Sequence, residues 1–149
     1  MTTWAEFAAA APDLAAFGEG RFREAEVAYV ATVRADGSPR VHPVTPVLCG
    51  GRLYLFMEPT SPKGHDLRRE PRYAMHSLVT DQHGNPGEFH TRGSATPVDD
   101  ATVRARVAEA APYDPMERWI VFEFSVDEAA STHYEGKEPV RRRWRAAGR

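Results

Sequence analysis

The chain has 149 residues, of which 42% are hydrophobic and 27% charged, and these values predict one soluble globular domain over residues 1–149. The formal net charge of −2 provides no general attraction to nucleic acid or to an anionic membrane, so neither is expected as a partner. The single cysteine excludes an internal disulfide, and without a signal-peptide pattern or a membrane-length apolar run we expect a cytoplasmic protein.

Two helices are expected over residues 3–24. Thr3 and Glu6 have the spacing of a capping box, in which each side chain bonds the backbone N–H of the other residue. Pro12 suits the first turn of a second helix, because proline lacks the N–H that a helix interior requires.

Three strands joined by short turns are expected next, at residues 27–33, 41–48 and 53–58. Pro43 and Pro46 remove two N–H donors from the second strand, which should therefore be irregular or lie at a sheet edge. We expect the strand that contains residues 42–44 to pair with residues 53–57 of the third.

A short helix should follow the third strand. Ser61 is a good N-cap, Pro62 suits the first helical position, Leu67 should face the core, and Pro71 ends the helix. The remaining elements are expected to be strands at 73–80, 88–98 and 119–124, a helix capped by Asp99 that runs to about 111, and a final hairpin of 131–134 with 140–144.

Gly93 stands inside the strand expected at 88–98 and marks a bulge or a point of close approach. Short antiparallel strands with few long connections predict a mainly β (α+β) fold, a small barrel over about 27–145 that carries peripheral helices. The strand–helix alternation of a doubly wound sheet is not present.

The start of the short helix has the features of an anion site. Its first N–H groups are free, Ser61 adds a hydroxyl, and Lys63 places a positive charge where the helix dipole opposes it. A phosphate would satisfy all three groups. Taken alone, the turn is more often an ordinary helix start with a lysine that faces solvent.

Neighbouring residues favour a ligand. Phe56 and Met57 end the preceding strand and would flank a flat ring. The backbone around His42, Pro43 and Val44 is interrupted by proline, and its unpaired groups would bond the polar edges of such a ring. A ring that carries a phosphate would use both regions together with Ser61-Pro62-Lys63.

Four stretches occur in a recognisable order: VATVRADGSPRVHPV at 30–44, LYLFM at 53–57, SPKGHDL at 61–67 and RGSA at 92–95. The ordered set resembles the pyridoxamine 5'-phosphate oxidase-like flavin-binding split-barrel proteins. The similarity is clearest over 27–98, with a weaker echo in 119–144. It implies a six-stranded antiparallel Greek-key split β-barrel that dimerises and holds flavin mononucleotide (FMN) in grooves at the subunit interface.

By position, the resemblance assigns Ser61 and Lys63 to the flavin phosphate. It places His42 where the oxidases usually carry an arginine that also meets the phosphate, and Glu88 near a glutamine that reaches the flavin. The candidate cofactor-binding residues are His42, Pro43, Val44, Phe56, Met57, Ser61 and Lys63.

The chain departs from the oxidases at several points. Pro62 replaces a basic residue, residues 110–115 do not match the segment that binds the substrate phosphate, and the C-terminal Arg-Leu-x-Pro ending is absent. The resemblance therefore implies an FMN-binding oxidoreductase whose small-molecule substrate or electron donor is unknown, and no catalytic residue is identified. The alternatives are a non-catalytic flavin-binding or sensing module, or a split barrel that uses deazaflavin or haem.

Two further patterns have simpler explanations. The six histidines do not form a zinc-hydrolase motif, so no metal site is expected. The arginine-rich end, Arg141-Arg142-Arg143-Trp144-Arg145, would suit phosphate contacts but is better explained as a solvated edge strand.

Overall fold

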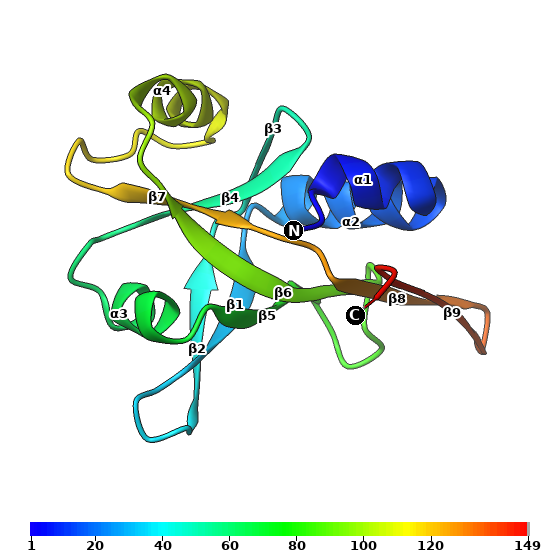
Figure 1. Ribbon diagram of the computed structural model, residues 1–149. Coiled ribbons are helices and arrows are strands. Elements are labelled where there is room, and N and C mark those ends of the chain that lie inside the picture. The colour runs from blue at the N-terminus through cyan, green and yellow to red at the C-terminus, as the bar shows by residue number, and fades with distance from the viewer. Residues whose placement is uncertain (149) are drawn as a thin grey trace.

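The computed structural model describes residues 1–148, and Arg149 lies outside the described residues. Within this part of the chain, nine antiparallel strands form one curled sheet with four helices around it (Figure 1). The helices are α1 (Trp4–Ala10), α2 (Pro12–Ala25), α3 (Pro62–Arg69) and α4 (Ala101–Ala110). The strands are β1 (Ala28–Val33), β2 (Pro39–Val44), β3 (Val47–Cys49), β4 (Arg52–Met57), β5 (Arg72–Ser77), β6 (Glu88–Val98), β7 (Ile120–Phe124), β8 (Glu128–Glu135) and β9 (Glu138–Arg145).

The long strand β6 joins the two halves of the sheet. The order along the main path is β2-β1-β5-β6-β7-β4-β3, and β8 pairs with both β6 and β9. Residues 88–94 of β6 pair with β5 and β8, whereas residues 95–98 pair with β7. Because one strand serves both halves, the sheet curls into a half-barrel. This arrangement confirms the predicted split-barrel α+β class.

Two apolar clusters fill the fold. The larger one lies between the sheet and the N-terminal helices, where Phe7 of α1 and Phe22 of α2 pack against Phe89 of β6, and all three are at most 2% exposed. The smaller cluster lies under α4, with Val107 packed on the outer side of β3, β4 and β7. No helix within residues 1–148 is long and apolar enough to cross a membrane.

The prediction of one strand over residues 41–48 is wrong. β2 pairs with β1 and β3 pairs with β4, and these two short strands stand at opposite ends of the strand order. Pro46, between them, has no N–H with which to continue a ladder. Residues 42–44 therefore do not pair with 53–57, although the expected edge position of this proline-rich segment is confirmed.

Most predicted helix boundaries are confirmed. The Thr3–Glu6 capping box forms, with Glu6 N donating to Thr3 Oγ1 over 3.2 Å, and Pro12 begins α2. The predicted cap of α4 is off by one residue, because Asp100 rather than Asp99 accepts bonds from the first free N–H groups of this helix.

Gly93 lies at a point of close approach, as predicted. A Cβ at this position would stand 2.3 Å from the carbonyl oxygen of Ser125. We expect Gly93→Ala to lower the free energy of unfolding by about 1–3 kcal/mol, because backbone must move to admit the methyl group. Urea denaturation would measure the change.

Gly20→Ala is the matched control for this prediction. Gly20 lies in α2, and its added Cβ would meet no atom within 4 Å. The control should leave stability unchanged or raise it by up to about 1 kcal/mol, through alanine's higher helix propensity. Equal behaviour of the two variants would contradict the steric account of Gly93.

Candidate functional site

The α3 corner consists of Ser61 and Lys63 at the start of α3 together with His42 of β2. Ser61 caps the helix, since its Oγ accepts the N–H of Gly64 over 3.2 Å, and Pro62 is the first helical residue. The first turn of α3 contains no acidic residue. The helix therefore starts as predicted, with a side-chain oxygen cap and a lysine at its positive end.

Lys63 is partly buried without a counterion. It forms neither an ion pair nor a hydrogen bond with any residue among 1–148. Burial lowers the pKa of its ammonium group, since desolvation disfavours the charged form. Binding of an anion would stabilise a partly buried lysine of this kind, because it provides the missing counterion.

His42 is the second unsatisfied group of the α3 corner. Its Nε2 atom is buried and has no hydrogen-bond partner within the described chain. Burial lowers the pKa of the imidazole, and the charges of Lys63 and Arg40 lower it further. The charge of Lys63 on α3 thus acts on the imidazole of His42 on β2, although β2 does not pair with β4.

Asp66 is a residue of this region that the sequence reasoning missed. Its side chain is 4% exposed and accepts three bonds, from Thr32 Oγ1 over 2.8 Å, Arg40 Nε over 2.7 Å and Arg69 Nη2 over 3.1 Å. Burial opposes its ionisation, but the bonds from Arg40, Thr32 and Arg69 outweigh this effect and lower the pKa of Asp66. The one signal in the sequence was the presence of Arg68 and Arg69 just after Asp66, which could serve as its ion-pair partners.

The side chains of Phe56 and Met57 point to opposite faces of β4. Phe56 is 7% exposed and packs in the cluster under α4, with the Arg104 guanidinium 5.3 Å from its ring centroid. Met57 is 1% exposed in the larger core. Because both side chains are packed against other residues of the protein, a ligand at the end of β4 would contact the backbone of this strand. Their predicted ligand contact stays a prediction.

The other predicted residues lie on β2. Pro43 is exposed on the outer side of the sheet, and Val44 is partly buried against the larger core. His42 and Val44 therefore share one face of β2, whereas Pro43 occupies the opposite face.

The charges at the α3 corner are unequal. The Asp66 carboxylate pairs with both Arg40 and Arg69, but Lys63 has no such partner in residues 1–148. An ammonium, an unpaired imidazole nitrogen and a helix N-terminus form a set of donors typical of a phosphate site. The corner is suited to bind a phosphate monoester.

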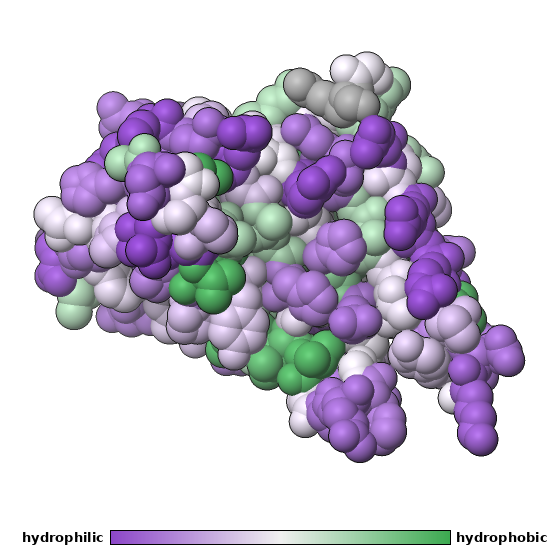
Figure 2. Space-filling view, turned by 90° about the horizontal axis from the view of Figure 1, so that it is seen from below, coloured by the Kyte–Doolittle hydropathy of each residue, from purple (hydrophilic) through white to green (hydrophobic). Residues whose placement is uncertain are grey.

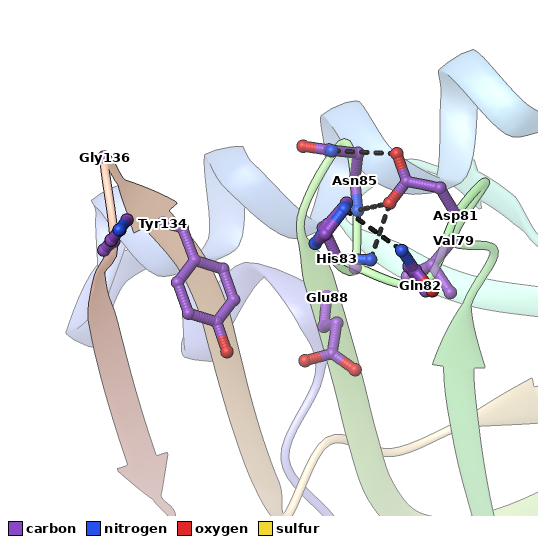
Figure 3. A pocket seen from close by; sticks show the side chains of 10 residues that line it. Val79, Asp81, Gln82, His83, Asn85, Glu88, Tyr134 and Gly136 are labelled. Carbon is purple, nitrogen blue, oxygen red and sulfur yellow. Dashed lines mark hydrogen bonds between the residues drawn. The ribbon is translucent and has the colours of Figure 1, made fainter.

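A cleft lies elsewhere, between the loop at 81–85 and the tip of the β8–β9 hairpin. It has a volume of 670 Å³, and the side chains of Glu88 and Tyr134 line it (Figure 3). Asp81 holds the loop by accepting bonds from the backbone of His83 and Asn85. None of the predicted cofactor ligands lines this cleft. Within residues 1–148, no group of three or more His, Cys, Asp or Glu side chains could hold a metal ion.

Comparison with known proteins identifies the family of this chain. The family model described as pyridoxamine 5'-phosphate oxidase matches residues 18–129, which include β1 to β7 and α3. The chain belongs to the pyridoxamine 5'-phosphate oxidase family. Comparison with curated proteins finds no match.

Several solved structures share the fold of this chain. A conserved hypothetical protein, Rv2991 from Mycobacterium tuberculosis, is 18% identical with a TM-score of 0.69, and the match covers 78% of this chain and 82% of that one. A pyridoxamine 5'-phosphate oxidase-related, FMN-binding protein from Nostoc punctiforme is 16% identical with a TM-score of 0.68, over 89% and 88%. A haem-binding protein from Mycobacterium smegmatis is 20% identical with a TM-score of 0.63, over 83% and 56%. At these identities the likeness shows the fold alone.

The charge of Lys63 makes a measurable prediction for His42. Lys63→Met should raise the pKa of His42 toward the ordinary 6.5, because one cause of its depression is removed. A pH titration of the His42 ring signals by NMR would detect the rise. Lys137→Met, in the turn between β8 and β9, is the control and should leave this pKa unchanged.

The protonation of His42 should also affect the stability of the fold in acid. The folded-state pKa of His42 lies below that of the unfolded chain, so the unfolded state binds more protons as the pH falls through about 6.5. Protonation of His42 thus destabilises the fold, and Lys63→Met should reduce this loss. An unchanged His42 titration in this variant would show that the two groups do not interact.

Proposed function

We propose that this protein binds FMN by its phosphate at the α3 corner and acts as a flavin-dependent oxidoreductase on a small-molecule substrate or electron donor. The observation that carries the proposal is the pair of unsatisfied groups, the Lys63 ammonium and the buried His42 Nε2. A buried polar atom without a partner costs free energy that a bound phosphate oxygen would recover.

The corner fits the phosphate in charge and in hydrogen bonding. Lys63 supplies a full positive charge, His42 supplies an N–H, and the first turn of α3 supplies backbone N–H groups. Ser61 uses its oxygen as acceptor for Gly64 N, which leaves its hydroxyl proton free to donate. The backbone of Pro43, Val44 and the end of β4 is available for the flavin ring.

The flavin itself would supply the hydride and electron transfer, whereas the protein supplies binding and orientation. Steady turnover with a nicotinamide donor would support the oxidoreductase. A non-catalytic flavin-binding module predicts tight FMN binding without turnover, so one assay separates these alternatives.

A second copy of this chain is the proposed partner. The outer face of β1 and β2 exposes Tyr29 and Val41, which are 40% and 65% exposed and stand on neighbouring strands. Apolar side chains also interrupt the polar surface in the view from below (Figure 2). Burial of an apolar sheet face of this kind is stabilising because it removes apolar side chains from water. A homodimer would bury this face.

Haem is a second candidate cofactor, because a haem-binding protein from Mycobacterium smegmatis shares the fold. Deazaflavin is a third, since it also combines a flat ring with a phosphate. Separate titrations with FMN, deazaflavin and haem, followed by absorbance, test the proposal directly. Micromolar FMN binding with weaker binding of the other two supports it, and the reverse order contradicts it.

The phosphate assignment predicts a selective effect of Lys63→Ala. FMN binding should weaken by about 1.5–3 kcal/mol, roughly tenfold to 150-fold, because a charge-assisted contact to phosphate is lost. Riboflavin, which has no phosphate, should bind almost as in the wild type. Flavin fluorescence quenching measures both affinities.

Lys137→Ala provides the control, because it removes the one other lysine of the chain from a turn remote from α3. Both flavins should bind this variant normally. Equal weakening of FMN and riboflavin in Lys63→Ala would rule out a specific phosphate contact.

The proposed dimer makes a prediction of its own. Val41→Asp should shift the protein from dimer to monomer in sedimentation velocity, because it places a charge on the apolar face. Met116→Asp is the control, since Met116 is 50% exposed but lies in the loop before β7. A wild-type protein that sediments as a monomer at micromolar concentration would refute the dimer.

A further inference from the structure

The buried carboxylate of Asp66 connects three elements at the α3 corner. It lies on α3, one turn after Lys63, so the two side chains share one side of the helix. Its partners Thr32 and Arg40 belong to β1 and β2. Neither the resemblance nor the family membership assigns a role to this residue.

The two strand partners of Asp66 form one rung of the ladder. Thr32 of β1 is registered directly opposite Arg40 of β2. Their bonds to Asp66 Oδ2 measure 2.8 Å and 2.7 Å, and the Asp66 side chain is 4% exposed. His42 follows Arg40 by two residues, so both side chains lie on the same face of β2. The bonds from Thr32 and Arg40 to Asp66 therefore attach α3 to β2 two residues away from His42.

We propose that Asp66 is a positioning residue for the phosphate: its carboxylate holds α3 against the Thr32–Arg40 rung and thereby keeps Lys63 beside His42. The inference rests on the proposed FMN binding and adds a residue that does not touch the ligand.

The position of Asp66 separates this role from a purely electrostatic one. Asp66 carries a negative charge near the phosphate, and its removal would leave Arg40 and Arg69 without their counterion. Electrostatics alone therefore predicts tighter FMN binding after Asp66→Asn. Positioning predicts weaker binding, because Lys63 is no longer held in place. The two roles differ in the sign of the effect.

The test measures FMN and riboflavin affinities of Asp66→Asn by fluorescence quenching. We expect FMN binding to weaken about tenfold, with riboflavin affinity changed much less. Combined with Lys63→Ala, the substitution should weaken FMN no further than Lys63→Ala alone, since Asp66 acts through Lys63. Unchanged or tighter FMN binding by Asp66→Asn would overturn the proposal, and so would additive losses in the double variant.

Glu70→Gln is the matched control. It removes the same charge at the other end of α3, where Glu70 forms an exposed ion pair with Arg72. FMN affinity should not fall in this variant. A fall equal to that of Asp66→Asn would assign the effect to loss of charge near α3 and overturn the positioning role.

Thr32→Val keeps the proposal testable if Asp66→Asn does not fold. It removes one anchor of Asp66 without a change in charge or much change in volume, and should lower FMN affinity in the same direction with riboflavin affinity retained. An unchanged ratio of the two affinities would count against positioning. Failure of the wild type to prefer FMN over riboflavin would instead refute the proposed function itself.

Discussion

The contact between Gly93 and Ser125 is the constraint on which the curl of the sheet depends. Ser125, just after β7, donates its N–H to Ser94 O and accepts the Ser94 N–H at its Oγ, each over 2.9 Å. Its carbonyl accepts the hydroxyl of Tyr73 from β5 over 2.7 Å. Three strands thus meet at the point where β6 passes from one half of the sheet to the other, and only glycine leaves room for them.

This curl decides where the α3 corner lies. α3 follows β4, in one half of the sheet, and precedes β5, in the other half. It therefore connects the two halves, and its Asp66 side chain bonds Arg40 of β2, a strand that within residues 1–148 pairs only with β1. The bonds from Asp66 to Thr32 and Arg40 hold α3 against β1 and β2.

The α3 corner combines a fixed charge with a titratable one. Lys63 remains unpaired within the described chain, whereas Arg40 and Arg69 are held by Asp66. By the family resemblance, His42 stands where the oxidases usually carry a permanently charged arginine. A histidine donates to phosphate from a neutral ring and gains a full charge only when it takes up a proton. At the proposed phosphate site, binding should therefore be more sensitive to pH than binding by arginine.

Local patterns in the sequence determined the elements of this protein. The capping box at Thr3, the Ser61-Pro62 helix start and the glycine at position 93 each depend on interactions within a few residues or on a steric requirement of one position. The same patterns identified the unusual lysine at the start of α3. Family resemblance supplied the fold, because its ordered motifs extend over several strands.

Tertiary structure alone decided the pairing and the charges. Pro43 and Pro46 predict an irregular strand, but the sequence does not reveal that β2 and β3 lie at opposite ends of the strand order. It shows an aspartate between arginines on α3, but not that this carboxylate is buried on a rung of β1 and β2. Both facts depend on contacts between residues more than twenty positions apart, and the energies of such contacts exist only once the chain has folded.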